Sequence, residues 1–200
     1  MHIKKHLSFS AIRKALSVLF ETIDDPRQAA KVDYSLHDCL MSILAMMFFQ
    51  DPSLLCFQRR MQDRFQDSNL KAMFAVENIP SDAALRQTLD QISTETIHPA
   101  FSELLQRLQR GKQLDAYKLE SGHYLIALDG SQYFTSEKIH CPSCLTYKGA
   151  KGTTRYSHQI LQAVMLNPHL RQVLPLAPEP IANTDGQSKQ DCEINAAKRS

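Results

Sequence analysis

The chain has 200 residues, 43% of them hydrophobic and 22% charged, and a formal net charge of +2. This composition excludes wholesale disorder, and the near balance of charge excludes a global basic field, so any binding of nucleic acid must come from local patches. The most apolar window, Cys39–Phe49, is too short to span a bilayer, and the N-terminus lacks the uninterrupted apolar run of a signal peptide, so we expect a cytoplasmic protein with no membrane partner.

Residues 1–111 have helical periodicity throughout, which predicts an all-helical region. Apolar residues recur at helical spacing from Ser8 to Ile23, and Asp24-Asp25-Pro26-Arg27 ends that helix because the residue before a proline leaves the helical region. Ser35 and Asp38 have the spacing of a helix cap. The helix that they open, Leu36–Gln50, is apolar on nearly every face, as is typical of the buried centre of a bundle.

Three more helices are predicted before residue 112. The first follows Asp51-Pro-Ser53, the second follows Ile79-Pro-Ser-Asp82, and the third is Ile97–Arg110 with Gly111 as its stop. The first two expose four arginines: Arg59, Arg60, Arg64 and Arg86. These arginines form either a solvated face or phosphate contacts of a helix-turn-helix-like DNA reader, and the alternatives stay open here.

The pattern changes at residue 112, where the polar segment 112–121 predicts a linker before a β-rich region, 122–200. Strands are predicted at Tyr124–Leu128, His158–Leu166 and Val173–Leu176, the last two paired as a hairpin around Asn167-Pro168-His169. Ser188–Ser200 is predicted as a helix, with a capping box from Ser188 to Asp191 and a Lys189–Glu193 pair.

This order of elements predicts an α+β chain. An N-terminal all-helical region is followed by the first half of a ribonuclease-H-like α/β domain, made of three strands and a helix, with an insertion at about 135–156.

Asp129 is the candidate metal ligand of the β-rich region. The apolar run Tyr124–Leu128 predicts a buried strand, and Gly130 permits a sharp exit that would leave the Asp129 carboxylate at the strand tip beside a cleft. Mg²⁺ prefers such oxygen ligands. The alternative is an ordinary Asp-Gly turn. The predicted topology favours the metal ligand, because the first strand of a ribonuclease-H-like fold offers the first metal-binding carboxylate.

Several segments together resemble bacterial insertion-sequence DDE transposases. The helical part contributes Asp25-Pro-Arg27, Tyr34-x-Leu and Pro80-Ser-Asp82, which are similar to the region before the catalytic core of that family. The β-rich part contributes Leu-Asp129-Gly130-Ser-Gln-Tyr-Phe, Glu137-Lys-Ile-His140-Cys141-Pro-Ser-Cys144, Tyr156-Ser-His158-Gln, Leu174-Pro-Leu-Ala-Pro-Glu179-Pro-Ile and Asp185-Gly-x-x-Lys189-x-Asp191-Cys192-Glu193-x-Asn195-Ala-Ala-Lys198-Arg199.

The resemblance implies DNA cleavage and strand transfer, that is, DNA recombination at transposon ends, by two Mg²⁺ or Mn²⁺ ions held on three acidic residues. It implies a helical region for DNA binding or dimerisation, with a homodimer left open. Asp129 matches the first acid, whereas the second and third are absent before Ser200, so we expect a truncated, catalytically incomplete transposase. The alternative is a DNA-binding fragment that recognises transposon ends or inhibits the full enzyme. A metallo-nuclease using Asp129 with Asp191 or Glu193 is a third hypothesis.

A second candidate metal site lies in the insertion. Cys141 and Cys144 have the spacing of zinc ligands, and His158 or His140 would complete the set. A structural zinc, free thiols and a redox pair all remain open, although the odd number of cysteines, five, argues against a disulfide framework.

The same insertion holds a basic loop. Lys148, Lys151 and Arg155 would either be solvated or contact DNA phosphates, with Tyr147 and Tyr156 available for stacking on bases.

Overall fold

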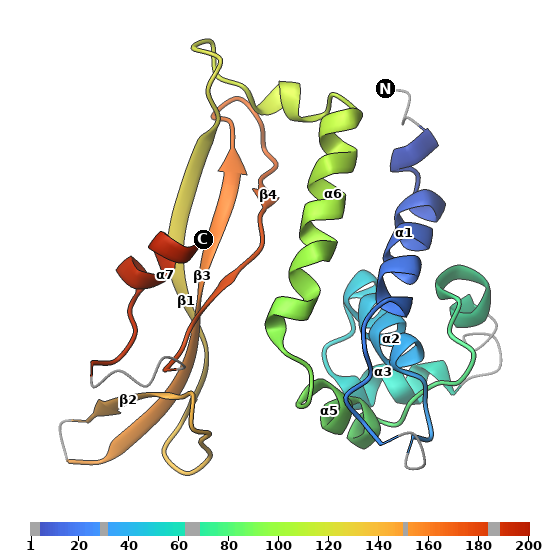
Figure 1. Cartoon of the computed structure of the whole chain (residues 1–200), viewed down its shortest axis with the longest axis vertical. Coiled ribbons are helices and arrows are strands. Elements are labelled where there is room, and N and C mark those ends of the chain that lie inside the picture. The colour runs from blue at the N-terminus through green and yellow to red at the C-terminus, as the bar shows by residue number, and fades with distance from the viewer. Residues whose placement is uncertain (1–4, 29–31, 63–68, 150–151, 184–188) are drawn as a thin grey trace. The chain divides into compact units, whose positions relative to one another are not determined.

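The computed structural model describes residues 5–28, 32–62, 69–149, 152–183 and 189–200. The chain divides into two compact units, Met1–Gly111 and Lys112–Ser200, which are described separately. The first is helical and the second is built on an antiparallel sheet, so the chain is α+β, as the sequence predicts (Figure 1).

The described part of the helical unit consists of short helices, and α1, α2, α3 and α5 begin at serine caps. In order they are the 3₁₀ turn η1 (Lys5–Leu7), α1 (Phe9–Glu21), α2 (Leu36–Phe49), α3 (Leu54–Met61), the π-helical turn η3 (Leu70–Phe74), α5 (Asp82–Leu89), the 3₁₀ turn η4 (Thr94–Ile97) and α6 (His98–Arg110). The side chains of Ser8, Ser35, Ser53 and Ser81 each accept a hydrogen bond from the backbone N–H three residues on. Each bond satisfies a donor that the first turn of a helix leaves free, which explains why these four helices begin there.

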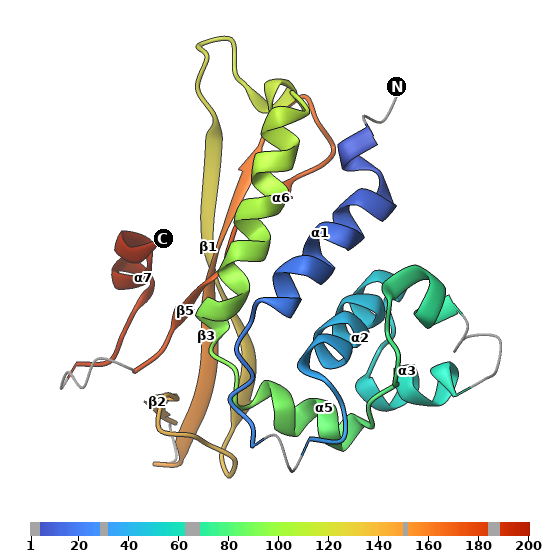
Figure 2. The same cartoon turned by 45° about the vertical axis from the view of Figure 1, so that its right-hand side comes forward.

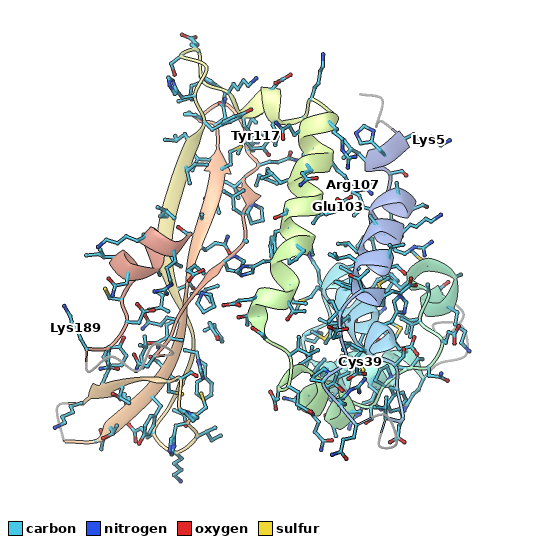
Figure 3. The ribbon with its side chains drawn as sticks, in the orientation of Figure 1. Lys5, Cys39, Glu103, Arg107, Tyr117 and Lys189 are labelled. Atoms are coloured by element: carbon cyan, nitrogen blue, oxygen red, sulfur yellow. The ribbon has the colours of Figure 1, made fainter. Side chains whose placement is uncertain are left out.

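The core of the helical unit is formed around α2, as its apolar pattern predicts. The side chains of Cys39, Met41 and Ala45 are fully buried, and residues of α3 and η3 pack against the same cluster (Figure 3 labels Cys39). The prediction of burial on every face is wrong at the last turn of α2, where Met47 and Phe48 are exposed. Within the described part of the chain, no single helix is long and apolar enough to cross a membrane, and only α2 and α3 together, bent by 97°, pass on length and composition.

The second unit is organised by one long strand. Its elements are the 3₁₀ turn η5 (Leu114–Tyr117), β1 (Leu125–Ser136), β2 (Leu145–Lys148), β3 (Thr154–Leu166), β4 (Leu174–Pro175), β5 (Glu179–Ile181) and α7 (Glu193–Arg199). β3 pairs with β1 along one edge and with β2, β5 and β4 in succession along the other, always antiparallel. The predicted hairpin around Asn167 is therefore present as β3 and β4. The sheet has five strands instead of the predicted three.

The predicted linker 112–121 contains regular structure. Its first half forms η5, and Lys118 bridges to Tyr124 in antiparallel fashion. The buried Asn167 side chain, on the turn after β3, donates to the carbonyl oxygens of Ala116 and Lys118, both at 3.3 Å. The segment is thus attached to the end of the sheet, because its polar backbone groups find partners there.

One face of β3 is buried and the other is half-buried. Leu161, Ala163 and Met165 alternate along the buried face, and a small core forms between Leu161 and residues Leu145, Ile181 and Ala196. Ala196 belongs to α7, so this helix covers the odd-numbered face of β3. In Figure 2, α7 lies to one side of the β1–β3 ribbon.

α7 is shorter than predicted. It begins at Glu193 after Cys192, so Lys189 precedes the helix and makes no helical pair with Glu193. Ser188, the predicted cap, lies outside the described residues. The physical reason lies in Asp191, whose carboxylate accepts hydrogen bonds from the N–H groups of Ala182 and Cys192 and binds Arg199 instead of continuing a helix.

Candidate functional site

Asp129 lies in the middle of β1 and not at a strand tip. β1 continues through Gly130 to Ser136, with Asp129 opposite Gln162 and Gly130 opposite Leu161 on β3. Both the predicted sharp exit and the alternative Asp-Gly turn are wrong, because the pairing with β3 runs past this point. The strand is also exposed where burial was predicted, with Leu128 50% accessible.

Gly130 is the point where α7 approaches the sheet. A Cβ atom added there would collide with the Glu193 carboxylate of α7. A glycine within a strand is typical of such close approach. Because the contact is with the far end of the flexible Glu193 side chain, it favours glycine without requiring it. Because successive side chains of a strand point to opposite faces, Asp129 lies on the face away from Glu193.

The other nearby candidate carboxylate is engaged in structure. The Asp191 side chain is 5% exposed, and its ion pair with Arg199 measures 2.8 Å. Arg199 also pairs with Glu179 at 2.6 Å and donates to the Pro180 carbonyl oxygen. The hydrogen bond from Arg199 lowers the pKa of Asp191, despite the opposing effect of burial. Asp191 and Arg199 thus join the start of α7 to β5.

The positions of Asp129, Asp191 and Glu193 show whether these residues fit a two-metal centre. Among the described residues, Asp129 belongs to no group of three or more side chains able to hold a metal. Glu193 lies on the opposite face and Asp191 is bound to Arg199. The described residues therefore do not form a two-metal site, and Asp129 as a ligand of Mg²⁺ or Mn²⁺ stays a prediction.

The thiols of the insertion meet His158 at close range. The Sγ atoms of Cys141 and Cys144 are 3.6 Å apart, and His158 Nε2 lies 3.4 Å from the first and 3.3 Å from the second. In the described part of the chain, these three residues form the only group of three or more His, Cys, Asp or Glu side chains whose ligand atoms are close enough to hold one metal ion. His140 is separate, because its ring stacks on Tyr156 with centroids 4.3 Å apart.

The surroundings of this cluster come from several elements. Burial raises the pKa of the Cys144 thiol, whose residue is 3% exposed. The Tyr133 and Phe134 rings lie 6.0 Å and 5.6 Å from the His158 ring, and Tyr133 is the extra residue of a bulge in β1. The sequence did not reveal these neighbours, because a bulge has no spacing signature of its own.

The predicted DNA-binding arginines of the helical unit differ in their surroundings. Arg60 is a structural residue, since it forms a two-pronged ion pair with Asp51 and lies 4.8 Å above the Phe49 ring. Arg59 and Arg86 are exposed, and Arg86 is 3.9 Å from Asp82 on the same helix. Arg64 lies outside the described residues. The exposed side chains of Arg59 and Arg86 remain candidates for phosphate contacts.

The predicted basic loop is the tip of a β-hairpin. Tyr147 is the cross-strand partner of Arg155, Lys148 is the partner of Thr154, and all four side chains are exposed. Arg155 Nε lies 3.3 Å from Glu137, a pair in which both side chains are more than half exposed. Lys151 lies outside the described residues.

Two sequence motifs of the helical unit, Asp25-Pro-Arg27 and the capping pair Ser35/Asp38, contain side chains that form hydrogen bonds between distant segments of the unit. The guanidinium of Arg27 donates to Asp25, to Thr88 Oγ1 at 2.9 Å and to the Tyr34 carbonyl oxygen at 3.0 Å. The Asp38 carboxylate, on the first turn of α2, accepts from the N–H groups of residues 77 and 78 at 2.8 and 3.2 Å. On α6, Arg107 binds Glu103 at 2.6 Å and the His6 carbonyl oxygen at 3.2 Å (Figure 3). The motifs of this unit thus hold the fold together.

Comparison with known proteins gives one match. Residues 18–105, which contain Arg27 and Asp38, match the model of the family described as DDE_Tnp_1-associated. Neither the curated proteins nor the solved structures gave a significant match to the chain. The family match over residues 18–105 therefore supports a DDE-type transposase N-terminal region for this part of the chain.

Proposed function

We propose that the chain acts in DNA transposition by binding DNA, including transposon ends, without cutting it. The observation that carries this proposal is the family match over residues 18–105, which gives the chain a transposase-related role. The absence of strand cleavage follows from the placement of the carboxylates. Among the described residues, Asp129 has no companions able to complete a metal site, and two-ion catalysis requires several such ligands.

The end of the β2–β3 hairpin is the DNA-contacting surface in this proposal. A two-stranded ribbon fits the grooves of DNA, and Lys148 and Arg155 place two cations at the end of this one. The exposed pair between Arg155 and Glu137 is worth little, since solvent screens it, so Arg155 is available to a phosphate. Tyr147 is exposed beside Arg155 and offers a ring for stacking.

We also propose that the second unit has the topology of a ribonuclease-H-like domain. Support comes from the order of its elements: a long strand, an insertion, antiparallel strands beside it, and a helix that covers one face. Among the described strands, β1 pairs only with β3, which leaves its other edge open to a further strand. If this chain occupies transposon ends without cutting them, it also competes there with a transposase that cuts them.

Removing the two cations of the hairpin is expected to weaken DNA binding and its dependence on salt. Each phosphate contact contributes about 0.9 to the slope of log affinity against log salt, so the double variant Lys148→Ala/Arg155→Ala should have a slope shallower by about 1.8 and an affinity roughly tenfold lower. Fluorescence anisotropy with a labelled duplex of about 30 base pairs and mixed sequence, measured at several salt concentrations, provides both values.

The matched control removes the same charge elsewhere on the second unit. Lys118 and Lys198 are both exposed, and the double variant Lys118→Ala/Lys198→Ala should retain the wild-type slope. Equal slopes for the wild type and both double variants would reject the hairpin as the contact surface. Wild-type protein that fails to bind the duplex even at low salt would reject the proposed function itself.

A further inference from the structure

We propose that Cys141, Cys144 and His158 form a zinc site, in which the protein supplies three ligands and the fourth position is open to solvent. The proposal goes beyond DNA binding, and no part of it depends on how DNA is bound. It rests on the distances between the ligand atoms, on the way the chain holds them, and on the chemistry of the donor set.

The distances between the ligand atoms fit a tetrahedral metal. With metal–sulfur bonds of about 2.3 Å and metal–nitrogen bonds of about 2.0 Å, tetrahedral ligands lie about 3.8 Å apart for two sulfurs and about 3.5 Å apart for sulfur and nitrogen. The corresponding separations here are 3.6 Å between the sulfurs, and 3.4 and 3.3 Å from the sulfurs to His158 Nε2. All three atoms therefore fit around one centre with shifts of a few tenths of an ångström.

The backbone holds the two thiols on one tight turn. The Cys144 N–H donates to the Cys141 carbonyl oxygen, and the Cys141 N–H donates to Cys144 Sγ, both at 3.2 Å. Asn183 clamps the turn from outside, since its N–H donates to the Ser143 carbonyl oxygen and its side chain donates to that of Cys144 at 3.1 Å. Such an arrangement reduces the ordering that a metal would have to impose.

The third ligand comes from the sheet. His158 lies on the half-buried face of β3, four residues from Gln162, the partner of Asp129. Residues two and four apart share a face of a strand, so His158 lies on the same face as Asp129, about 13 Å along the strand. A metal on His158 would thus fasten the insertion to the face that contains Asp129, beside the hairpin that bears Lys148 and Arg155.

The donor set selects the ion. Two thiolates and an imidazole suit zinc, whereas Mg²⁺ and Ca²⁺ prefer oxygen ligands. The insertion also lacks a hydrophobic core of its own, because Ile139 is exposed and residues 135–143 contribute no buried side chain. A bound metal would stabilise such a segment. The described residues offer no fourth His, Cys, Asp or Glu in this group, and His140 is stacked on Tyr156. We assign the remaining position to water.

Metal content measured on the purified full chain tests the site. Protein exposed to zinc under reducing conditions and then dialysed should retain about one zinc ion per chain, as counted by mass spectrometry of the metal. The variants Cys144→Ser and His158→Ala should each lose most of it. Cys56→Ser and His140→Ala should retain the wild-type content, since Cys56 lies on α3 and His140 is outside the cluster.

Cobalt provides a second readout on the wild-type chain, which removes any dependence on how well a variant folds. After removal of zinc by a chelator, added Co²⁺ should give the thiolate charge-transfer band and the strong visible bands of a tetrahedral site, and zinc should displace both. Unfolding by urea, followed by tyrosine fluorescence, should shift to higher urea when zinc is restored. Five of the six tyrosines lie in the second unit, so this signal reports mainly on that unit.

Three results would overturn the zinc site: a metal-free wild type after zinc exposure with both thiols reduced, full zinc retention by Cys144→Ser, or a Cys141–Cys144 disulfide under the same reducing conditions. None of them bears on DNA binding by Lys148 and Arg155. The zinc site and the proposed function can therefore fail separately.

Discussion

Replacement of Arg27 with alanine is expected to destabilise the helical unit by about 2–4 kcal/mol. The Arg27 side chain is only 13% exposed, and it joins the loop before α2 to α5 through Asp25, Tyr34 and Thr88. Alanine would leave the Asp25 carboxylate without its partner and the buried Thr88 hydroxyl without the donor at 2.9 Å. The buried Thr88 hydroxyl would carry the full cost of desolvation, whereas water would solvate the exposed Asp25 carboxylate.

Urea unfolding followed by far-ultraviolet circular dichroism measures this effect, because most helical residues lie in the first unit. Arg27→Lys should recover only part of the stability, since an ammonium cannot reproduce the fork that a guanidinium presents to Asp25. Arg59→Ala serves as the control, as Arg59 is exposed, and should change stability by less than about 0.5 kcal/mol. Equal midpoints for Arg27→Ala and Arg59→Ala would contradict the assigned role.

The hydrogen-bonded ion pair between Arg27 and Asp25 should make the free energy of unfolding depend on pH. The hydrogen bond from Arg27 lowers the pKa of Asp25 in the folded chain, whereas an unfolded aspartate titrates near about 3.9. The unfolded chain therefore takes up the proton first, so this contribution is complete above about pH 4 and is lost as the pH falls through the folded pKa. Arg27→Ala should show a smaller loss of stability below about pH 4 than the wild type.

Replacement of Asp38 with alanine is the second change with a large expected effect, a loss of about 2–4 kcal/mol. Asp38 is 3% exposed, and its two oxygens accept the N–H groups of Glu77 and Asn78, 39 and 40 residues along the chain. The carboxylate also lies on the first turn of α2, where the helix dipole favours a negative charge. Without it, two backbone donors lose their acceptor and the loop loses its attachment to α2.

The variants Asp38→Ala and Asp38→Asn separate the loss of both accepted hydrogen bonds from the loss of one. Asp38→Asn retains one acceptor oxygen but turns an amide donor toward the other N–H, so its loss should be smaller than that of alanine and still above about 1 kcal/mol. Asp90→Asn is the control, because Asp90 is exposed at the end of α5. An Asp38→Asn midpoint indistinguishable from that of Asp90→Asn would show that the two hydrogen bonds contribute little.

Local spacing predicted where the helices begin but not what their polar residues do. Ser35 and Asp38 indicated the start of α2 correctly, since a cap is a contact between neighbours in sequence. The partners of the Asp38 carboxylate at residues 77 and 78 depend on packing between distant segments, so no local pattern indicates them. Asp25-Pro-Arg27 was likewise interpreted as a helix stop, and its role in binding α5 was missed for the same reason.

In the second unit, too, local sequence patterns did not indicate contacts between distant segments. The apolar run before Asp129 correctly predicted a strand, but Gly130 was interpreted as its end because a turn and a close helix contact both favour glycine. Spacing alone brought Cys141 and Cys144 together, whereas it left His140 and His158 as alternatives. The choice between them follows from the β3 register and from the stacking of His140 on Tyr156.

The central claim, DNA binding without cleavage, is tested most directly on supercoiled plasmid incubated with the full chain and Mg²⁺ or Mn²⁺. We expect the protein to retard the plasmid in a gel and, once the protein is digested away, to leave no more nicked or linear DNA than the Asp129→Asn variant does. Metal-dependent nicking by the wild type that disappears in Asp129→Asn would contradict the claim.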